Sequence, residues 1–302
     1  MLKYDSELQL INDLASSWEA NEDQTEYIFT IQDYATWHDG ENVTADDVVF
    51  TFQSIQDPDF KSPLLISFRG VEVEKIDELT VKFILPEAYP SFLEVLTVGI
   101  LPEHIWGEIP PINANLTKFN LKPIGSGSWK FKKFFDDELG NIKSYVIEPH
   151  TEFYGPKPYL QEITFKFYPD FETAVGAVKN NSTEGISFLP KELKSELINE
   201  KEINFYSFHL PQYTALFINQ KQNEILKSKS VRKALAVSID KPKLLTEALQ
   251  LEGEIIDGPI LPVNVNQDDG RNEFNPTLAN QLLEEADWER ITAAEYQNFL
   301  DE

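Results

Sequence analysis

Cysteine is absent from the 302-residue chain. Without a thiol the protein forms no disulfide, no thiolate metal site and no covalent intermediate on a cysteine nucleophile. An extracytoplasmic protein often avoids stray thiols, but many cytosolic proteins lack cysteine as well. The absence therefore excludes these kinds of site and leaves the compartment open.

Long apolar runs and basic residues are also scarce. No run approaches the roughly 18 apolar residues that a membrane-spanning helix needs, and residues 1–5 are too polar to open a signal peptide. The chain has 26 Lys and Arg against 51 Asp and Glu, a net charge of −25. This charge favours solubility and argues against nucleic acid and anionic membrane surfaces as partners. A preference for cationic ligands stays open.

The residues that are present are typical of a globular protein. The 21 Phe and 11 Tyr argue against disorder. A chain of 302 residues can bury a sizeable core, and this length is typical of two domains or one large one.

Residues 37–53 predict a strand, a tight turn and a helix. Gly40 tolerates positive φ and follows an Asp, which favours the turn. Thr44 is a good N-cap, and Asp47 three residues later forms a near capping box. Asp57, which precedes a proline, predicts the end of the helix. The apolar stripe of this helix consists of Val48, Val49, Phe52 and Ile55.

Signals of catalysis are weak. The four histidines lie in separate segments with neither H-E-x-x-H nor i,i+4 spacing, and we interpret His38 as a turn residue. A G-x-S-x-G elbow is missing. Adjacent carboxylates are common in so acidic a chain. A glycosidase needs two carboxylates roughly 5 to 10 Å apart across a cleft, so a secreted glycoside hydrolase is a remote alternative.

The run W-H-D-G-x-x-V-T-A-D-D-V-V-F-T-F resembles the signature segment of the extracytoplasmic solute-binding proteins of family 5. These are the oligopeptide-, dipeptide- and nickel-binding receptors of bacterial ABC importers. Similar segments follow in family order from about residue 8 to 289: 10–19, 100–104, 123–131, 154–167, 184–190, 213–220, 231–241 and 258–262.

The resemblance implies an α/β, bilobal, periplasmic-binding-protein-like architecture (class II, family 5 type) with an extra small lobe and mixed sheets flanked by helices. It also implies a chain that is incomplete at both termini. The expected domains are an edge segment of the main lobe (1–15), the small lobe (16–118), the main lobe (119–217) and the beginning of a third domain (218–302).

Local patterns predict further elements. Strands are expected at 27–31 and 163–167, and a hairpin at 71–76 and 79–85. The Pro- and Asn-rich residues 110–123 indicate a linker. Asp170, Ser230 and Asn275 are the expected N-caps of three helices. The resemblance adds strands at 184–190 and 213–220.

The resemblance also implies where a ligand binds. Members of the family hold peptides as an added strand between two lobes. The expected contacts are two glycines with the serine between them and two strand edges: Gly125, Ser126, Gly127, Ser187, Phe188, Leu189, Gln212, Tyr213 and Thr214. Each of these residues, taken alone, also fits a turn or a core position.

The function that the resemblance implies is the substrate-binding component of an ABC importer. Its partners would be a peptide or another small solute and the permease subunits in the membrane, with the protein itself a monomer. It would work outside the membrane, in the periplasm or anchored to lipid, without a cofactor, a metal or enzymatic activity. A degenerate family member that acts as a sensor or surface protein is the alternative.

Overall fold

A computed structural model describes residues 1–200, 202–208, 212–249, 252–256, 273–291 and 296. It divides into two compact units, Met1–Lys201 and Glu202–Glu302. We describe each unit by itself. The predicted domain boundaries at 15, 118 and 217 remain predictions.

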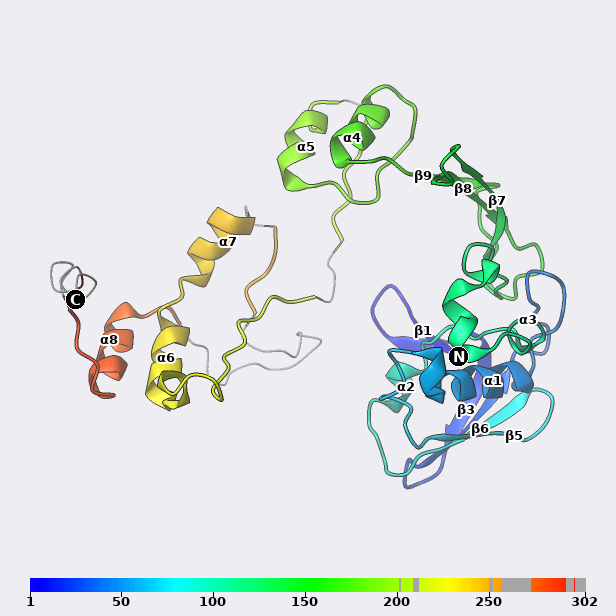
Figure 1. Cartoon of the computed structure of the whole chain (residues 1–302), viewed down its shortest axis with the longest axis horizontal. Helices are drawn as coiled ribbons and strands as arrows, with labels where there is room; N and C mark the ends of the chain where they lie inside the picture. Colours follow the sequence, from blue (N-terminus) through cyan, green and yellow to red (C-terminus); the bar gives the residue numbers. More distant parts are fainter. Residues whose placement is uncertain (201, 209–211, 250–251, 257–272, 292–295, 297–302) are drawn as a thin grey trace. The chain divides into compact units, whose positions relative to one another are not determined.

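The first unit contains a four-stranded antiparallel sheet in the order β3-β4-β6-β5 (Figure 1). Its central strand β4 alternates between half-buried and buried residues, because Tyr27, Phe29 and Ile31 point into the core. The strand predicted at 27–31 is thereby confirmed, and the antiparallel pairing of the fifth and sixth strands confirms the predicted hairpin. The strands are β3 (Ala15–Ala20), β4 (Glu26–Ile31), β5 (Glu72–Lys75) and β6 (Thr80–Ile84), and a separate pair consists of β1 (Leu2–Tyr4) and β2 (Leu10–Asn12).

Aromatic rings join this sheet to the helix α1 (Ala45–Gln56). Phe52 of α1 meets Phe83 of β6 edge to face, with ring centroids 5.0 Å apart, and Phe83 meets Phe29 in the same way at 5.6 Å. All three side chains are fully buried. Burying a side chain of this size contributes about 1.5–3 kcal/mol, so the predicted apolar stripe of α1 holds the helix on the sheet.

The start of α1 depends on the buried carboxylate of Asp47. Its oxygens accept hydrogen bonds from the backbone N–H of Thr44 at 2.8 Å, the indole N–H of Trp37 at 3.2 Å and the backbone N–H of Glu103 at 2.8 Å. The helix cap predicted at Thr44 and Asp47 is therefore confirmed. The carboxylate of Asp47 also binds a distant loop. One carboxylate joins the turn before the helix, the first turn of the helix and a loop 56 residues away.

Thr51, one turn further along α1, holds the same loop. Its hydroxyl accepts a hydrogen bond from the N–H of Leu101 at 2.8 Å and donates one to the carbonyl of Asp47 at 2.7 Å. Asp57 ends the helix, as predicted. Short helices follow around this loop: η1 (Pro58–Phe60), α2 (Phe92–Val95) and α3 (Glu103–Trp106).

The linker predicted at residues 110–123 is a compact connection. It contains two 3-10 helices, η2 (Pro111–Leu116) and η3 (Lys118–Asn120). Ala114 is buried, and the side-chain amide of Asn120 donates to its carbonyl at 2.8 Å. Side-chain to backbone bonds of this kind order a segment that lacks helix or sheet ladders.

A three-stranded antiparallel sheet follows this connection (Figure 1). Its strands are β7 (Trp129–Asp136), β8 (Ile142–Pro149) and β9 (Ile163–Lys166), and the last confirms a predicted strand. Asp170 caps α4 (Phe171–Lys179) as expected, by accepting a hydrogen bond from the N–H of Thr173 at 2.7 Å. Helix α5 (Lys191–Leu197) completes the unit.

The second unit is helical in its described part: η4 (Ile225–Lys227), α6 (Lys229–Val237), α7 (Lys241–Leu249) and α8 (Pro276–Glu284). Ala234 and Val237 of α6 pack against Ala279 of α8. Asn275 caps α8 as predicted. The cap of α6 is Ser228 and not Ser230, because the hydroxyl of Ser228 is the one that accepts the N–H of Val231.

Two further expectations are wrong for the described residues. Residues 184–190 and 213–220 are not strands, because neither segment has a hydrogen-bonded neighbour within the described ranges, and a strand requires one. All described strand pairs are antiparallel. Within the same ranges, none of the helices is long and apolar enough to cross a membrane.

The bonds to Asp47 predict unequal effects of two neighbouring aspartates. Asp47→Ala leaves buried N–H donors unpaired and should lower the free energy of unfolding by on the order of 3 kcal/mol. Asp46→Ala removes only the exposed pair with Lys75 and should cause a much smaller loss. Urea unfolding of both variants measures the difference, and equal losses would show that the Asp47 bonds do not hold the loop.

Candidate functional site

His38 connects the turn before α1 to the glycine segment before β7. Its backbone N–H donates to the carbonyl of Gly125 at 2.8 Å, and the N–H of Gly125 donates to Nδ1 of the ring at 3.1 Å. The ring Nε2 lies 3.0 Å from the carbonyl of Gly127. Three hydrogen bonds thus join residues that are 87 to 89 positions apart.

These contacts fix the protonation state of His38. Since Nδ1 accepts the N–H of Gly125, it carries no proton, and Nε2 must then carry one to donate to Gly127. Neutral imidazole satisfies every contact. An imidazolium would place a second N–H against that of Gly125, so the joint requires the uncharged ring.

A second imidazole lies beside the first. The rings of His38 and His150 meet edge to face with centroids 5.0 Å apart, and His150 is buried with its Nδ1 unpartnered among the described residues. Burial lowers the pKa of both imidazoles below the ordinary value, and the charge of Lys130 lowers both further. The pair is therefore built to stay neutral.

The turn that presents His38 is rigid. Trp37 before it is fully buried and exchanges backbone hydrogen bonds with Glu41 and Gly40 across the turn. Gly40 has φ +98°, which only glycine adopts without strain. His104 Nε2 lies 2.9 Å from the carboxylate of Asp39 and holds the tip of the turn.

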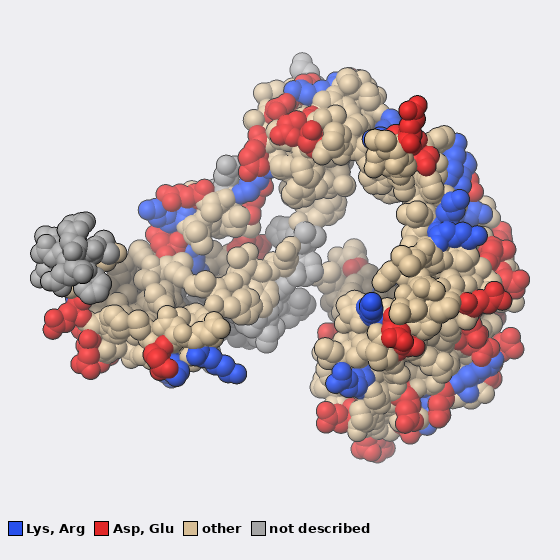
Figure 2. All heavy atoms as spheres, in the orientation of Figure 1, with Lys and Arg blue, Asp and Glu red and all other residues tan. Residues whose placement is uncertain are grey.

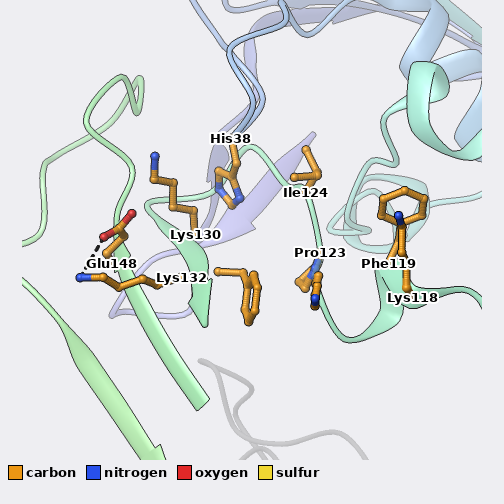
Figure 3. A pocket seen from close by; sticks show the side chains of 10 residues that line it. His38, Lys118, Phe119, Pro123, Ile124, Lys130, Lys132 and Glu148 are labelled. Atoms are coloured by element: carbon orange, nitrogen blue, oxygen red, sulfur yellow. Dashed lines mark ion pairs between the residues drawn. The ribbon is translucent and has the colours of Figure 1, made fainter. Parts of the chain in front are cut away.

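A cavity of about 440 Å³ opens beside this joint (Figure 3). His38 and Lys130 lie on one side of it, Lys118 and Phe119 on the other, and Pro123 lies between them. The remaining lining residues are Lys122, Ile124, Phe131, Lys132 and Glu148. Four of the ten lining residues are lysines, although the chain as a whole is acidic.

The structure places the predicted ligand contacts in three segments. Residues 125–127 pair with His38, and Gly127 is exposed. Residues 187–189 connect α4 to α5, where the exposed Phe188 meets Phe171 edge to face at 5.7 Å. Residues 212–214 belong to the second unit, and Tyr213 is 42% exposed. A single site that combines the three remains a prediction.

Metal binding has no candidate among the described residues, where His, Asp and Glu form no group of three that could hold an ion.

A family model described as "Bacterial extracellular solute-binding proteins, family 5 Middle" matches residues 9–299. The chain belongs to this family. The expected fold is thereby confirmed, and family members are extracytoplasmic solute-binding proteins rather than enzymes.

Several relatives resemble the chain over nearly its whole length. The oligopeptide-binding protein AppA of Bacillus subtilis is 30% identical over 297 residues, which cover 95% of this chain and 53% of AppA. NikZ from Campylobacter jejuni, solved in complex with Ni(L-His), has 28% identity and a TM-score of 0.76 over 94% of this chain and 56% of NikZ. The structure of Bacillus subtilis AppA in complex with a nonapeptide has 28% identity and a TM-score of 0.70 over 97% of this chain and 58% of AppA. The chain spans about half the length of the curated relatives it matches.

Sequence reasoning missed the joint and the cavity. The sequence indicates that His38 is a turn residue, which it is, but nothing near it indicates a partner 87 residues away. His150 carries no local signal either. The lysines of the cavity did have one, because residues 109–135 contain five lysines and no Asp or Glu.

The two neutral imidazoles predict a pH dependence of stability. Unfolded histidine titrates near 6.5, and both native pKa values are lower. As the pH falls through about 6.5, the unfolded chain binds protons that the native protein does not, so the free energy of unfolding decreases. Above about pH 7.5 both states are neutral and this contribution is constant.

Urea unfolding between pH 5.5 and 8 measures this effect. The variant His38→Gln keeps a donor and an acceptor at the joint but removes one titrating group. We expect it to lose less stability on acidification than the parent protein. An unchanged slope would contradict a neutral His38.

Proposed function

We propose that the protein captures a peptide or similar small solute outside the membrane and delivers it to the permease of an ABC importer. The single observation that carries this proposal is the match of a solute-binding family over nearly the whole chain. The relatives named above bind a nonapeptide and Ni(L-His), which supports a small, polar solute. The protein performs no covalent chemistry on it.

Main-chain groups at two of the three predicted contact segments favour a peptide as the ligand. The N–H and C=O groups of residues 187–189 and 212–214 form no hydrogen bond with other described residues. An extended peptide would bind such groups through hydrogen bonds from its own main chain. Ser187 and Tyr213 are both exposed, as a contact residue must be before the ligand arrives.

The glycine segment offers a third contact. A Cβ atom added at Gly127 would meet nothing within 4 Å, so the space over this backbone is free. At Gly125 the same atom would lie 3.3 Å from Cε1 of His38. The ring of His38 therefore packs closely on Gly125, whereas the space at Gly127 has room for the main chain of a ligand.

A thermal-shift screen of the protein as its gene encodes it tests the function. The probes are short peptides, Ni(L-His) and oligosaccharides. A ligand present at 100 times its dissociation constant should raise the free energy of unfolding by about 2.7 kcal/mol. We expect stabilisation by peptides. Stabilisation by none of the three classes would refute the proposed capture of a solute.

The two glycines provide a matched pair of variants. Gly125→Ala crowds His38 and should lower the melting temperature. Gly127→Ala should leave the melting temperature unchanged, because its methyl group enters free space, and should weaken peptide binding by obstructing the ligand backbone. Calorimetric titration of Gly127→Ala with the best peptide measures this, and parental affinity would remove residues 125–127 from the proposed site.

A further inference from the structure

Basic residues are concentrated, and acidic ones absent, along the connection between the four-stranded and the three-stranded sheet and along β7. Residues 109–135 contain five lysines and no Asp or Glu, whereas acidic residues number 51 of 302 in the whole chain. At that frequency, 27 residues would contain about four or five acids. Figure 2 shows Lys and Arg atoms gathered over the region that Figure 1 labels β7 and β8.

Four of these lysines line one cavity, that of about 440 Å³ beside His38. Lys118 and Lys122 come from the connection, and Lys130 and Lys132 come from β7. The volume lies within the range of roughly 300–1,000 Å³ that is usual for small-molecule sites. The cavity thus concentrates positive charge in a space of ligand size.

Among the described residues, carboxylates pair with only one of the four ammonium groups. Lys132 pairs with Glu148 at 3.3 Å and with Glu162 at 2.9 Å. Lys118 and Lys122 lie instead over the rings of Phe119 and Phe134, at 5.3 and 5.5 Å from the centroids. Lys130 has no carboxylate within ion-pair distance in the described ranges.

Glu148 is the one carboxylate in the lining, and it pairs with Lys132. The ammonium groups of Lys118, Lys122 and Lys130 therefore repel one another without a paired carboxylate among the described residues. An anion in the cavity would offset the repulsion. The lining also includes apolar groups from Pro123, Ile124 and Phe131, which suit the carbon body of a ligand. Both observations favour an organic anion over a simple ion.

We propose that this cavity binds a small organic anion that carries at least two carboxylate or phosphate groups. Lys118, Lys122 and Lys130 bind its charged groups, and Phe131 contacts its body. The site lies within the first unit and includes none of the nine predicted peptide contacts, although His38 and Ile124 of its lining adjoin residues 125–127. Binding of a polyanion is therefore measured separately from the proposed capture of a peptide.

Calorimetric titration with citrate and with pyrophosphate at low ionic strength tests the proposal, with acetate as the monovalent control. We expect at least one of the two polyanions to bind with 1:1 stoichiometry, acetate to bind far more weakly, and added salt to weaken the binding. No heat from either polyanion up to millimolar concentration would overturn the proposal. The same holds if anionic phosphatidylglycerol vesicles bind and neither polyanion competes, because the occupant would then be a lipid surface.

Two double variants with the same change in net charge locate the site. Lys122→Gln with Lys130→Gln should weaken polyanion binding at least about tenfold, because charge-assisted hydrogen bonds are lost. Lys133→Gln with Lys143→Gln removes two lysines of the same sheet that do not line the cavity, and should change the affinity less than about twofold. Equal losses would indicate diffuse attraction and overturn the proposal.

Conservative variants guard against a folding defect. Lys122→Arg with Lys130→Arg keeps both charges and should retain binding within a few fold. If the glutamine variant has a lower melting temperature, the arginine variant still tests whether the positive charges at positions 122 and 130 bind the polyanion. Loss of binding in a folded arginine variant would contradict recognition by charge at these positions.

Discussion

A single buried carboxylate organises the first unit. Asp47 accepts from the indole of Trp37, from the cap position Thr44 and from Glu103. These donors belong to three segments, each of which would otherwise leave an N–H group without this partner. The carboxylate therefore satisfies the start of a helix and closes a long loop with the same two oxygens. The aromatic core beneath α1 depends on this arrangement, because it fixes how the helix lies on the sheet.

The joint at His38 extends this order to the second sheet of the unit. Trp37 is held by Asp47, and the next residue binds Gly125 and Gly127. The buried carboxylate and the neutral imidazole are thus neighbours along one rigid turn. One holds its partners by accepting from three donors, and the other holds them because it is uncharged.

Signals confined to a few adjacent residues predicted the structure well. The cap at Thr44, the turn at Gly40 and the stop at Asp57 were all confirmed, because each depends on short-range bonds. The expected strands at 184–190 and 213–220 failed, because a strand needs a neighbour that the segment itself does not specify. The bond between His38 and Gly125 and the gathering of lysines around one cavity arise only from folding. The excess of lysine in residues 109–135 is visible in the sequence. Only the folded structure shows that four of these lysines line one cavity.

The unpaired backbone of residues 187–189 and 212–214 has a consequence for handling the protein. Exposed N–H and C=O groups beside apolar side chains such as Phe188 are templates for intermolecular pairing. Two copies of the protein can therefore pair through these groups. A peptide bound as proposed would block that pairing and so oppose aggregation.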